Sequence, residues 1–119
     1  MTDEVIVSLP EKVGEYDTLR LSVRHSKAGY GGMDWTLRPG GLKLNFSPCT
    51  RTEYGFRSTL MGEKWESGFF MVINDDARKN PHKIKRILSR VQERAEKFAK
   101  AYSARDGETL RALADEVKE

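Results

Sequence analysis

Cysteine is nearly absent from this chain, whose 119 residues contain only one, Cys49. A single thiol cannot form an internal disulfide, and unpaired thiols are typical of reducing compartments, so we expect a cytoplasmic protein. Cys49 lies between Pro48 and Thr50, outside any local motif of a cysteine protease. We therefore interpret it as a structural thiol.

Histidine is almost as scarce, which removes the commonest catalytic and metal-binding signatures. The chain has only His25 and His82, and neither stands in the ligand spacing of a zinc site. The adjacent carboxylates Asp75 and Asp76 precede a predicted helix, where the helix dipole explains them without acid–base chemistry. We predict a protein that is not an enzyme, with no catalytic residues, no metal site and no cofactor.

Long apolar runs are also missing. No stretch approaches the roughly 18–20 apolar residues that a membrane span needs, so we expect no membrane association. The first nine residues carry Asp3 and Glu4 instead of the basic start of a signal peptide. Because domains typically contain about 100–200 residues, we predict a single domain over residues 1–119, with a sheet in 1–76 and helices in 77–119.

Basic charge is abundant and unevenly distributed. Residues 1–76 hold nine basic and eleven acidic side chains, whereas residues 77–119 hold twelve and seven. Between Arg78 and Lys100, nine basic side chains are accompanied only by Glu93 and Glu96. This asymmetry predicts an anionic partner. The alternative is that the charged helix face is simply solvated.

The longest periodic pattern runs from Asn80 to Ala104 and predicts one amphipathic helix, with Asn80 as its N-cap and Pro81 in its first turn. Its apolar positions are Ile84, Ile87, Leu88, Val91, Ala95, Phe98 and Tyr102. Asp106 and Gly107 predict that it ends in a left-handed turn. A short second helix is predicted from Leu110, Leu113, Ala114 and Val117.

Alternating apolar and polar residues predict strands in the first part of the chain. The first covers residues 5–9 and is stopped by Pro10, a loop follows over residues 11–17, and the second strand covers residues 19–24. We interpret residues 26–32 as a flexible, glycine-containing hairpin tip. The segment from Arg38 to Gly41 predicts a type II turn that joins residues 35–37 to residues 42–46 in a hairpin.

Two further strands complete the predicted sheet, over residues 54–60 and in the run from Trp65 to Ile73. Residues 69–73 are apolar on both faces, which is typical of a central strand or of one covered by a helix. Strands followed by helices predict an α+β fold. We expect an antiparallel meander of about five strands, followed by the long amphipathic helix and the short C-terminal helix packed on one face.

A stripe of cations lies beside the apolar stripe of the long predicted helix, within about 80° around its axis. Arg86, Arg90 and Arg94 are successive i,i+4 neighbours, and such like charges cost about 0.2–0.5 kcal/mol per pair. A local rule broken without structural gain points to function. The basic stripe, as we name it, consists of Lys83, Arg86, Arg90, Arg94 and Lys97.

The predicted strands carry further cations in their polar phase. If one face of the sheet is wet, Arg20, Arg24 and Lys43 point to it, and Arg57 joins them. Single-strand binders combine such cations with exposed aromatic side chains. Tyr30, in the glycine-containing segment, is the aromatic residue that we most expect in water.

A meander of strands followed by a long basic helix resembles, in element order, Whirly-type single-strand-binding proteins, which implies a nucleic-acid-binding function. Five spaced cations in the basic stripe could contact the phosphate backbone with little sequence preference. We therefore predict a nucleic-acid-binding module that uses the basic stripe and the sheet arginines. This function would be favoured if the basic stripe, the sheet cations and exposed aromatic residues formed one continuous surface.

The alternative is a protein-interaction module that meets an acidic protein surface. Such a module would inhibit or regulate a nucleic-acid-processing machine, and the chain is similar in general character to accessory proteins of phages and other mobile elements. We expect a monomer or a weak homodimer in either case.

Overall fold

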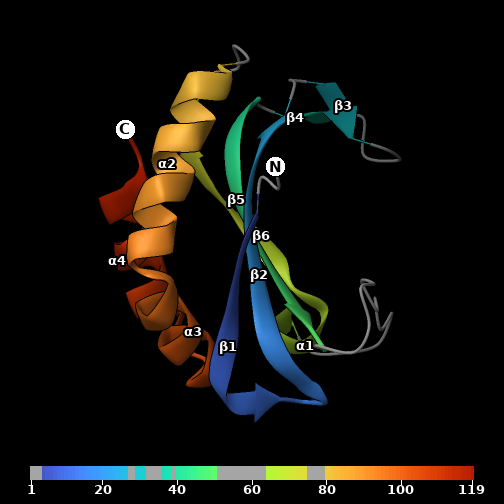
Figure 1. Ribbon diagram of the computed structural model, residues 1–119. Helices are drawn as coiled ribbons and strands as arrows, with labels where there is room; N and C mark the ends of the chain where they lie inside the picture. Colours follow the sequence, from blue (N-terminus) through green and yellow to red (C-terminus); the bar gives the residue numbers. More distant parts are fainter. Residues whose placement is uncertain (1–3, 27–28, 32–35, 39, 51–63, 75–79) are drawn as a thin grey trace.

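The chain folds around an antiparallel sheet that helices cover on one face (Figure 1). This computed structural model describes residues 4–26, 29–31, 36–38, 40–50, 64–74 and 80–119, with the backbone alone for residues 26, 29–31, 36–38 and 64. Within these ranges the main sheet has four strands, which confirms the antiparallel α+β class but differs from the expected five. In spatial order they are β1 (Glu4–Val13), β2 (Tyr16–Ser26), β5 (Gly41–Cys49) and β6 (Phe69–Asn74).

The first strand is longer than the sequence indicated. β1 continues past Pro10 to Val13, so the prediction that Pro10 stops the strand is wrong. β1 lies at the edge of the sheet, where a proline removes no ladder hydrogen bond that a neighbour needs. Its register with β2 also shifts between Ser8 and Val13, on either side of the proline.

A two-residue turn joins β1 to β2, where a loop over residues 11–17 was expected. Gly14 occupies the turn with a φ of 62°, in the left-handed region that glycine enters without steric cost. A Cβ at this position would also lie 2.2 Å from Glu66 Oε1. The glycine thus marks the turn correctly, but the polar residues beside it belong to strands.

A small second sheet pairs β3 (Gly29–Gly31) with β4 (Thr36–Arg38). The prediction of a flexible tip is therefore wrong for residues 29–31. The predicted hairpin of residues 35–37 with 42–46 is also wrong, because β4 pairs with β3 and β5 pairs with β2 and β6. β2 offers β5 a register from Thr18 to Ser26, a far longer ladder than the three residues of β4 could provide.

The predicted run from Trp65 to Ile73 contains a helical turn and a strand. Trp65 belongs to α1 (Lys64–Ser67), and Gly68, with a φ of 86°, turns the chain into β6. Among the described strands, β6 lies at an edge of the main sheet and not at its centre. The other alternative, a strand covered by a helix, is the one that the structure supports. The predicted strand over residues 54–60 lies outside the described residues.

The long predicted helix consists of two helices, α2 (Pro81–Glu93) and α3 (Ala95–Ser103), separated at Arg94. The backbone N–H of Arg94 donates to Val91 O at 3.1 Å. Arg90 O, its regular helical partner, instead accepts from the Arg94 guanidinium at 3.1 Å. A side chain inserted into the ladder is a recognised cause of a kink, and no proline or glycine signals it here.

The helix ends follow capping chemistry. Asn80 caps α2 as predicted, because its side chain accepts from Lys83 N at 3.2 Å. Asp106 caps α4 (Gly107–Val117) by accepting from Thr109 N at 3.1 Å, and the Thr109 hydrogen bonds lower the pKa of Asp106. The predicted left-handed turn is formed by Arg105, with a φ of 53°, and not by a glycine.

The core lies between the sheet and the helices α2, α3 and α4. Every apolar position predicted for the long helix contacts this core, with Ile84 and Leu88 only partly buried. The four positions predicted for α4 are buried as well. Phe46, Phe69, Phe98, Trp65 and Tyr102 form an aromatic cluster with ring centroids 5.0–6.2 Å apart.

Helices also cover parts of both sheet edges. On β1, Ser103 of α3 donates to Glu11 O at 2.9 Å. On β6, Arg111 of α4 donates to Val72 O at 3.0 Å. Covered edges protect a sheet from pairing with other chains. Within the described ranges, no helix has the length and apolar content needed to cross a membrane.

Candidate nucleic-acid interface

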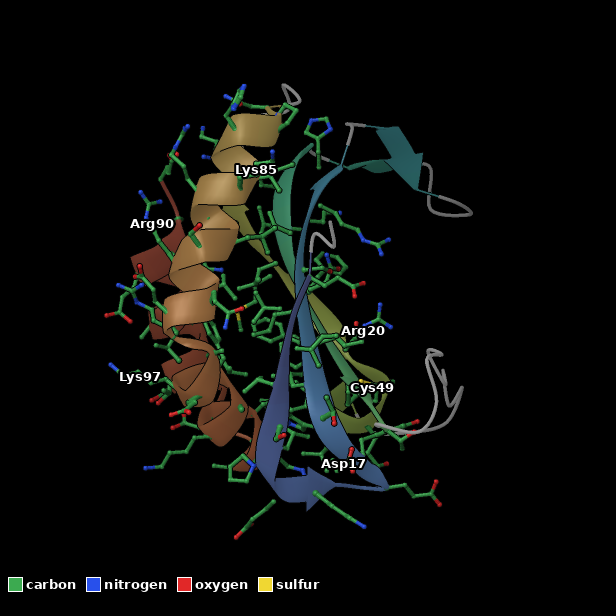
Figure 2. All side chains as sticks on the ribbon, viewed as in Figure 1. Asp17, Arg20, Cys49, Lys85, Arg90 and Lys97 are labelled. Atoms are coloured by element: carbon green, nitrogen blue, oxygen red, sulfur yellow. The ribbon has the colours of Figure 1, made fainter. Side chains whose placement is uncertain are left out.

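One face of the main sheet points away from the helices. Successive side chains alternate between the faces of a strand, so Arg20 points away from the face that carries the buried Leu19 and Leu21. Figure 2 shows Arg20 on the side of the sheet that faces away from the helices. On this side Ile6 is 57% exposed and Phe70 is 53% exposed. We call this surface the open face; its side chains are Glu4, Ile6, Arg20, Ser22, Arg24, Lys43, Asn45, Ser47, Phe70 and Val72.

Two cations meet across the strands of the open face. Arg24 on β2 and Lys43 on β5 are directly opposite each other in register, a pairing that puts Cβ atoms about 4.5–5.5 Å apart. Like charges in this position destabilise a sheet. Within the described residues Arg24 forms no hydrogen bond or ion pair. The structure thus brings the predicted sheet cations together in an arrangement that costs stability.

An aromatic ring lies beside this cation pair. Lys43 Nζ lies 4.5 Å from the centroid of the Phe70 ring, and an exposed cation–π contact of this kind contributes about 0.5–1 kcal/mol. The contact crosses from β5 to β6, the neighbouring strand. It orients the Lys43 ammonium beside an aromatic surface that remains half exposed.

The third sheet cation has an acidic partner. Arg20 on β2 forms an ion pair with Glu4 on β1, and both side chains are partly buried. The charge of Arg20 is therefore balanced in the folded chain, and Glu4 places a carboxylate on the open face. This pair could not be predicted from the sequence, because the contact depends on the register between β1 and β2.

A groove of about 520 Å³ runs over the open face. Arg20 and Arg24 line it beside hydroxyl and amide groups, which can donate or accept hydrogen bonds. The open-face residues that line it are Glu4, Arg20, Ser22, Arg24, Asn45, Ser47 and Phe70. The groove can therefore accommodate an anionic ligand that also presents polar edges and a flat apolar surface.

Cys49 lies on the same side of the sheet as Arg20 (Figure 2). It faces Thr18 in register, and both residues are buried. Burial raises the pKa of the Cys49 thiol, and the nearby Arg20 guanidinium only partly opposes that effect. The thiol is therefore protonated at neutral pH, the unreactive form.

The central arginines of the basic stripe contact α4. Arg86 Nε donates to Glu119 Oε1 at 2.6 Å, which lowers the pKa of Glu119 and raises that of Arg86. Arg90 donates to Val117 O at 3.3 Å. These contacts join α2 to the end of α4, so the arginines have a structural role that the sequence interpretation missed.

Arg94 is held in the same way. Its guanidinium lies 4.0 Å from Glu116 Oε2 and 3.5 Å from Glu93 Oε2. Two acids thus accompany an arginine that the sequence placed in an uninterrupted basic stripe. Glu116 comes from α4, and helical periodicity cannot reveal a partner on another helix.

The basic stripe and the open face lie on opposite sides of the molecule. Figure 2 shows Arg90 and Lys97 on the outer side of the helices, whereas Arg20 lies beyond the sheet. The two sets of cations therefore do not form the continuous surface that would have joined them in one site. Lys97 is exposed and makes no hydrogen bond or ion pair within the described part of the chain.

Two predicted site residues cannot be placed in either surface. Arg57 lies outside the described residues, and for Tyr30 only the backbone, in β3, is described. Phe70 was not among the predicted site residues. The sequence signal for Phe70 was that residues 69–73 are apolar on both faces. We interpreted this pattern as a strand that is central or covered by a helix, and not as an exposed aromatic residue.

Comparisons of the chain with protein-family models, curated proteins and solved structures gave no match. Within the described ranges, no group of three or more His, Cys, Asp or Glu side chains gathers in a way that could hold a metal ion. The geometry of the open face and of the basic stripe is therefore the basis for a functional proposal.

Proposed function

We propose that this protein is a small nucleic-acid-binding module that contacts the phosphate backbone through the open face of its sheet. The observation that carries the proposal is the register pair of Arg24 and Lys43, which adjoins the exposed Phe70 in a polar groove. A phosphate group between the two cations would turn their repulsion into a shared attraction.

The chemistry of the groove suits a phosphate backbone. Cationic side chains contact phosphates without reading sequence, whereas hydroxyl and amide side chains contact sugars, phosphates and base edges. Ser22 and Asn45 lie in the row next to the cation pair. This combination supports binding that is strongly salt-dependent and only weakly sequence-dependent.

The basic stripe has a secondary part in this proposal. Arg86, Arg90 and Arg94 contact α4, so recruiting them to a ligand would weaken contacts that join the helices. Lys83 also contributes to the lowered pKa of Glu119, whereas Lys97 makes no hydrogen bond or ion pair within the described part of the chain. We therefore assign the principal contacts to the open face.

A second function is favoured by the apolar side chains of the open face. Ile6, Phe70 and Val72 are large hydrophobic residues that are at least 36% exposed, and apolar residues framed by polar ones are typical of protein interfaces. An acidic protein surface with apolar residues would complement this face. The protein would then regulate a partner, such as a nucleic-acid-processing machine.

The proposal is tested by fluorescence anisotropy with a labelled oligonucleotide over a salt series. Three variants each remove two positive charges: Arg24→Ala/Lys43→Ala on the open face, Lys83→Ala/Lys97→Ala on the basic stripe, and Lys85→Ala/Lys100→Ala as the matched control. Each phosphate contact to a single strand contributes about 0.7 to the log–log salt slope. We expect the open-face variant to flatten the slope by about 1.4.

The same series can contradict the proposal. If the wild-type protein does not bind at low salt, nucleic acid is not its ligand. If the stripe variant flattens the slope and the open-face variant does not, the interface is on the helices. Equal losses in all three variants would indicate a general effect of net charge.

A further inference from the structure

Among the aromatic side chains that the structure describes, Phe70 is the one that is not packed in the core. The neighbouring Phe69 faces the helices and contacts the ring of Tyr102, whereas Phe70 faces the groove and is 53% exposed. Leaving a large apolar side chain in water forgoes the stabilisation that burial would give. A ligand that covers the ring would recover it.

We infer that the open face binds single-stranded nucleic acid, with an unpaired base stacked on Phe70 and its phosphates at Arg24 and Lys43. This inference rests on the proposed function and narrows it to strands whose bases are unpaired. Every base has a π-face, so stacking on an aromatic side chain tolerates any sequence. In a duplex these faces are hidden between neighbouring base pairs.

The dimensions of the open face oppose a duplex as the ligand. Adjacent strands lie about 4.8 Å apart, so the four strands span about 14 Å between their axes. The major groove of B-DNA is about 12 Å wide and admits a helix or a two-stranded ribbon. A face four strands wide cannot enter it, and the Phe70 ring could not reach the face of a paired base.

The order of side chains along the strands fits a single strand. Arg24, Lys43 and Val72 form one row, Glu4, Ser22, Asn45 and Phe70 form the next, and Ile6, Arg20 and Ser47 form the third. Rows lie about 7 Å apart along the strands. The free cation pair therefore stands beside the row that holds the aromatic ring and two hydrogen-bonding side chains, at whose β1 end Glu4 is paired with Arg20.

This arrangement assigns roles to the first two rows. The row of Arg24 and Lys43 contacts phosphates, the ring of Phe70 supports a base, and the Asn45 amide reaches a base edge. Deoxyribose and ribose strands share the base and phosphate chemistry, so the test includes both.

The experiment measures the affinity of the full chain for a labelled oligo(dT), an oligo(U) and a duplex, each of about 12 nucleotides per strand. Phe70→Ala and Phe70→Leu remove the ring, and Phe70→Tyr retains it. Phe70→Leu preserves most of the apolar surface, so comparing it with Phe70→Tyr separates stacking from hydrophobic contact. Circular dichroism checks that each variant is folded.

We expect the single strands to bind at least about tenfold more tightly than the duplex. Loss of the ring in Phe70→Ala and Phe70→Leu should weaken binding by about 5- to 150-fold, the range for one stacked base, while Phe70→Tyr binds like the wild type. A preference for oligo(U) over oligo(dT) would assign the site to RNA, and the reverse to DNA.

The outcomes separate this inference from the proposed function. The stacking inference is wrong if the duplex binds as tightly as the single strands, or if Phe70→Leu binds as well as the wild type. In that case the proposed function still stands, provided that Arg24→Ala/Lys43→Ala weakens binding. Absence of wild-type binding to all three probes overturns both. If polyglutamate displaces the oligonucleotide at equal charge concentration, the groove selects for charge alone, which also contradicts stacking and favours an acidic protein partner.

Discussion

The two faces of the main sheet are built from the same strands but differ in chemistry. The side of Leu21, Leu44 and Phe46 is packed against α2, α3 and α4, and these three side chains are fully buried. Along the same strands, Arg24 and Lys43 occupy alternate positions on the open face. Their like charges face each other across the strands, an arrangement that packing does not require.

Because of this difference, neighbouring residues of a single strand are expected to affect different properties, either the stability of the fold or the binding of a ligand. A residue on the covered face contributes through burial, whereas its neighbour on the open face contributes almost nothing to the core. Substitutions on the covered face should therefore change the free energy of unfolding, and substitutions on the open face should change affinity. The following predictions test that separation.

The largest effect is expected from a matched pair of phenylalanine truncations. Phe98→Ala removes a fully buried ring from α3 and should lower the free energy of unfolding by about 3–5 kcal/mol. Phe70→Ala removes a half-exposed ring and should lower it by less than about 1 kcal/mol, mainly through the lost contact with Lys43. Urea denaturation measures both, and equal losses would show that Phe70 belongs to the core.

Removing the acid from the open face should strengthen binding. Glu4→Gln frees Arg20 from its ion pair and removes a carboxylate that repels phosphate. A surface charge interaction of this kind corresponds to about a two- to fivefold change in affinity. Anisotropy with the oligonucleotide measures it, and Glu96→Gln on α3 provides the control for net charge. Weaker binding in Glu4→Gln than in the control would contradict the proposed interface.

Reversing one charge of the cation pair should have opposite effects on stability and binding. Arg24→Glu converts a like-charge cross-strand pair into an opposite-charge pair with Lys43, and should raise the free energy of unfolding by about 0.2–1 kcal/mol. The same substitution should reduce oligonucleotide affinity. Chemical denaturation and anisotropy on one preparation test both signs, and loss of stability would show that the two side chains do not interact.

The smallest effect is expected at the contact between α2 and α4. Arg86 lowers the pKa of Glu119 below its model-peptide value of 4.5, so the stabilisation is present above that pH and is lost as the pH falls through the lowered pKa. Arg86→Gln should therefore reduce Tm slightly at about pH 7 and not at about pH 2. A difference that persists in acid would mean that the contact is not electrostatic.

The sequence predicted the features that local periodicity determines. It did not predict the contacts between segments that are distant in the chain, such as strand pairing. Apolar spacing identified the buried face of the long helix, and Asn80 identified its start. The turn predicted for residues 38–41 did not reveal that β4 pairs with β3, because turn residues reverse the chain direction without determining which strand pairs with which. The break at Arg94 depends on where one guanidinium binds, and composition does not encode that choice.

The candidate site was predictable to a similar extent. Strand alternation correctly grouped Arg20, Arg24 and Lys43 on one face. It did not reveal the exposure of Phe70, because the edge position of β6 is a property of the whole sheet. The ion pair of Arg86 with Glu119 joins residues 33 positions apart, so the basic stripe appeared uninterrupted in the sequence.

The central claim is that the open face, and not the helices, binds nucleic acid. The most direct test records the backbone amide chemical shifts of the ¹⁵N-labelled protein by NMR as an oligo(dT) is added. The account predicts shift changes concentrated at residues 20–24, 43–47 and 69–72. Changes concentrated instead at residues 83–97, with the open face unaffected, would contradict it.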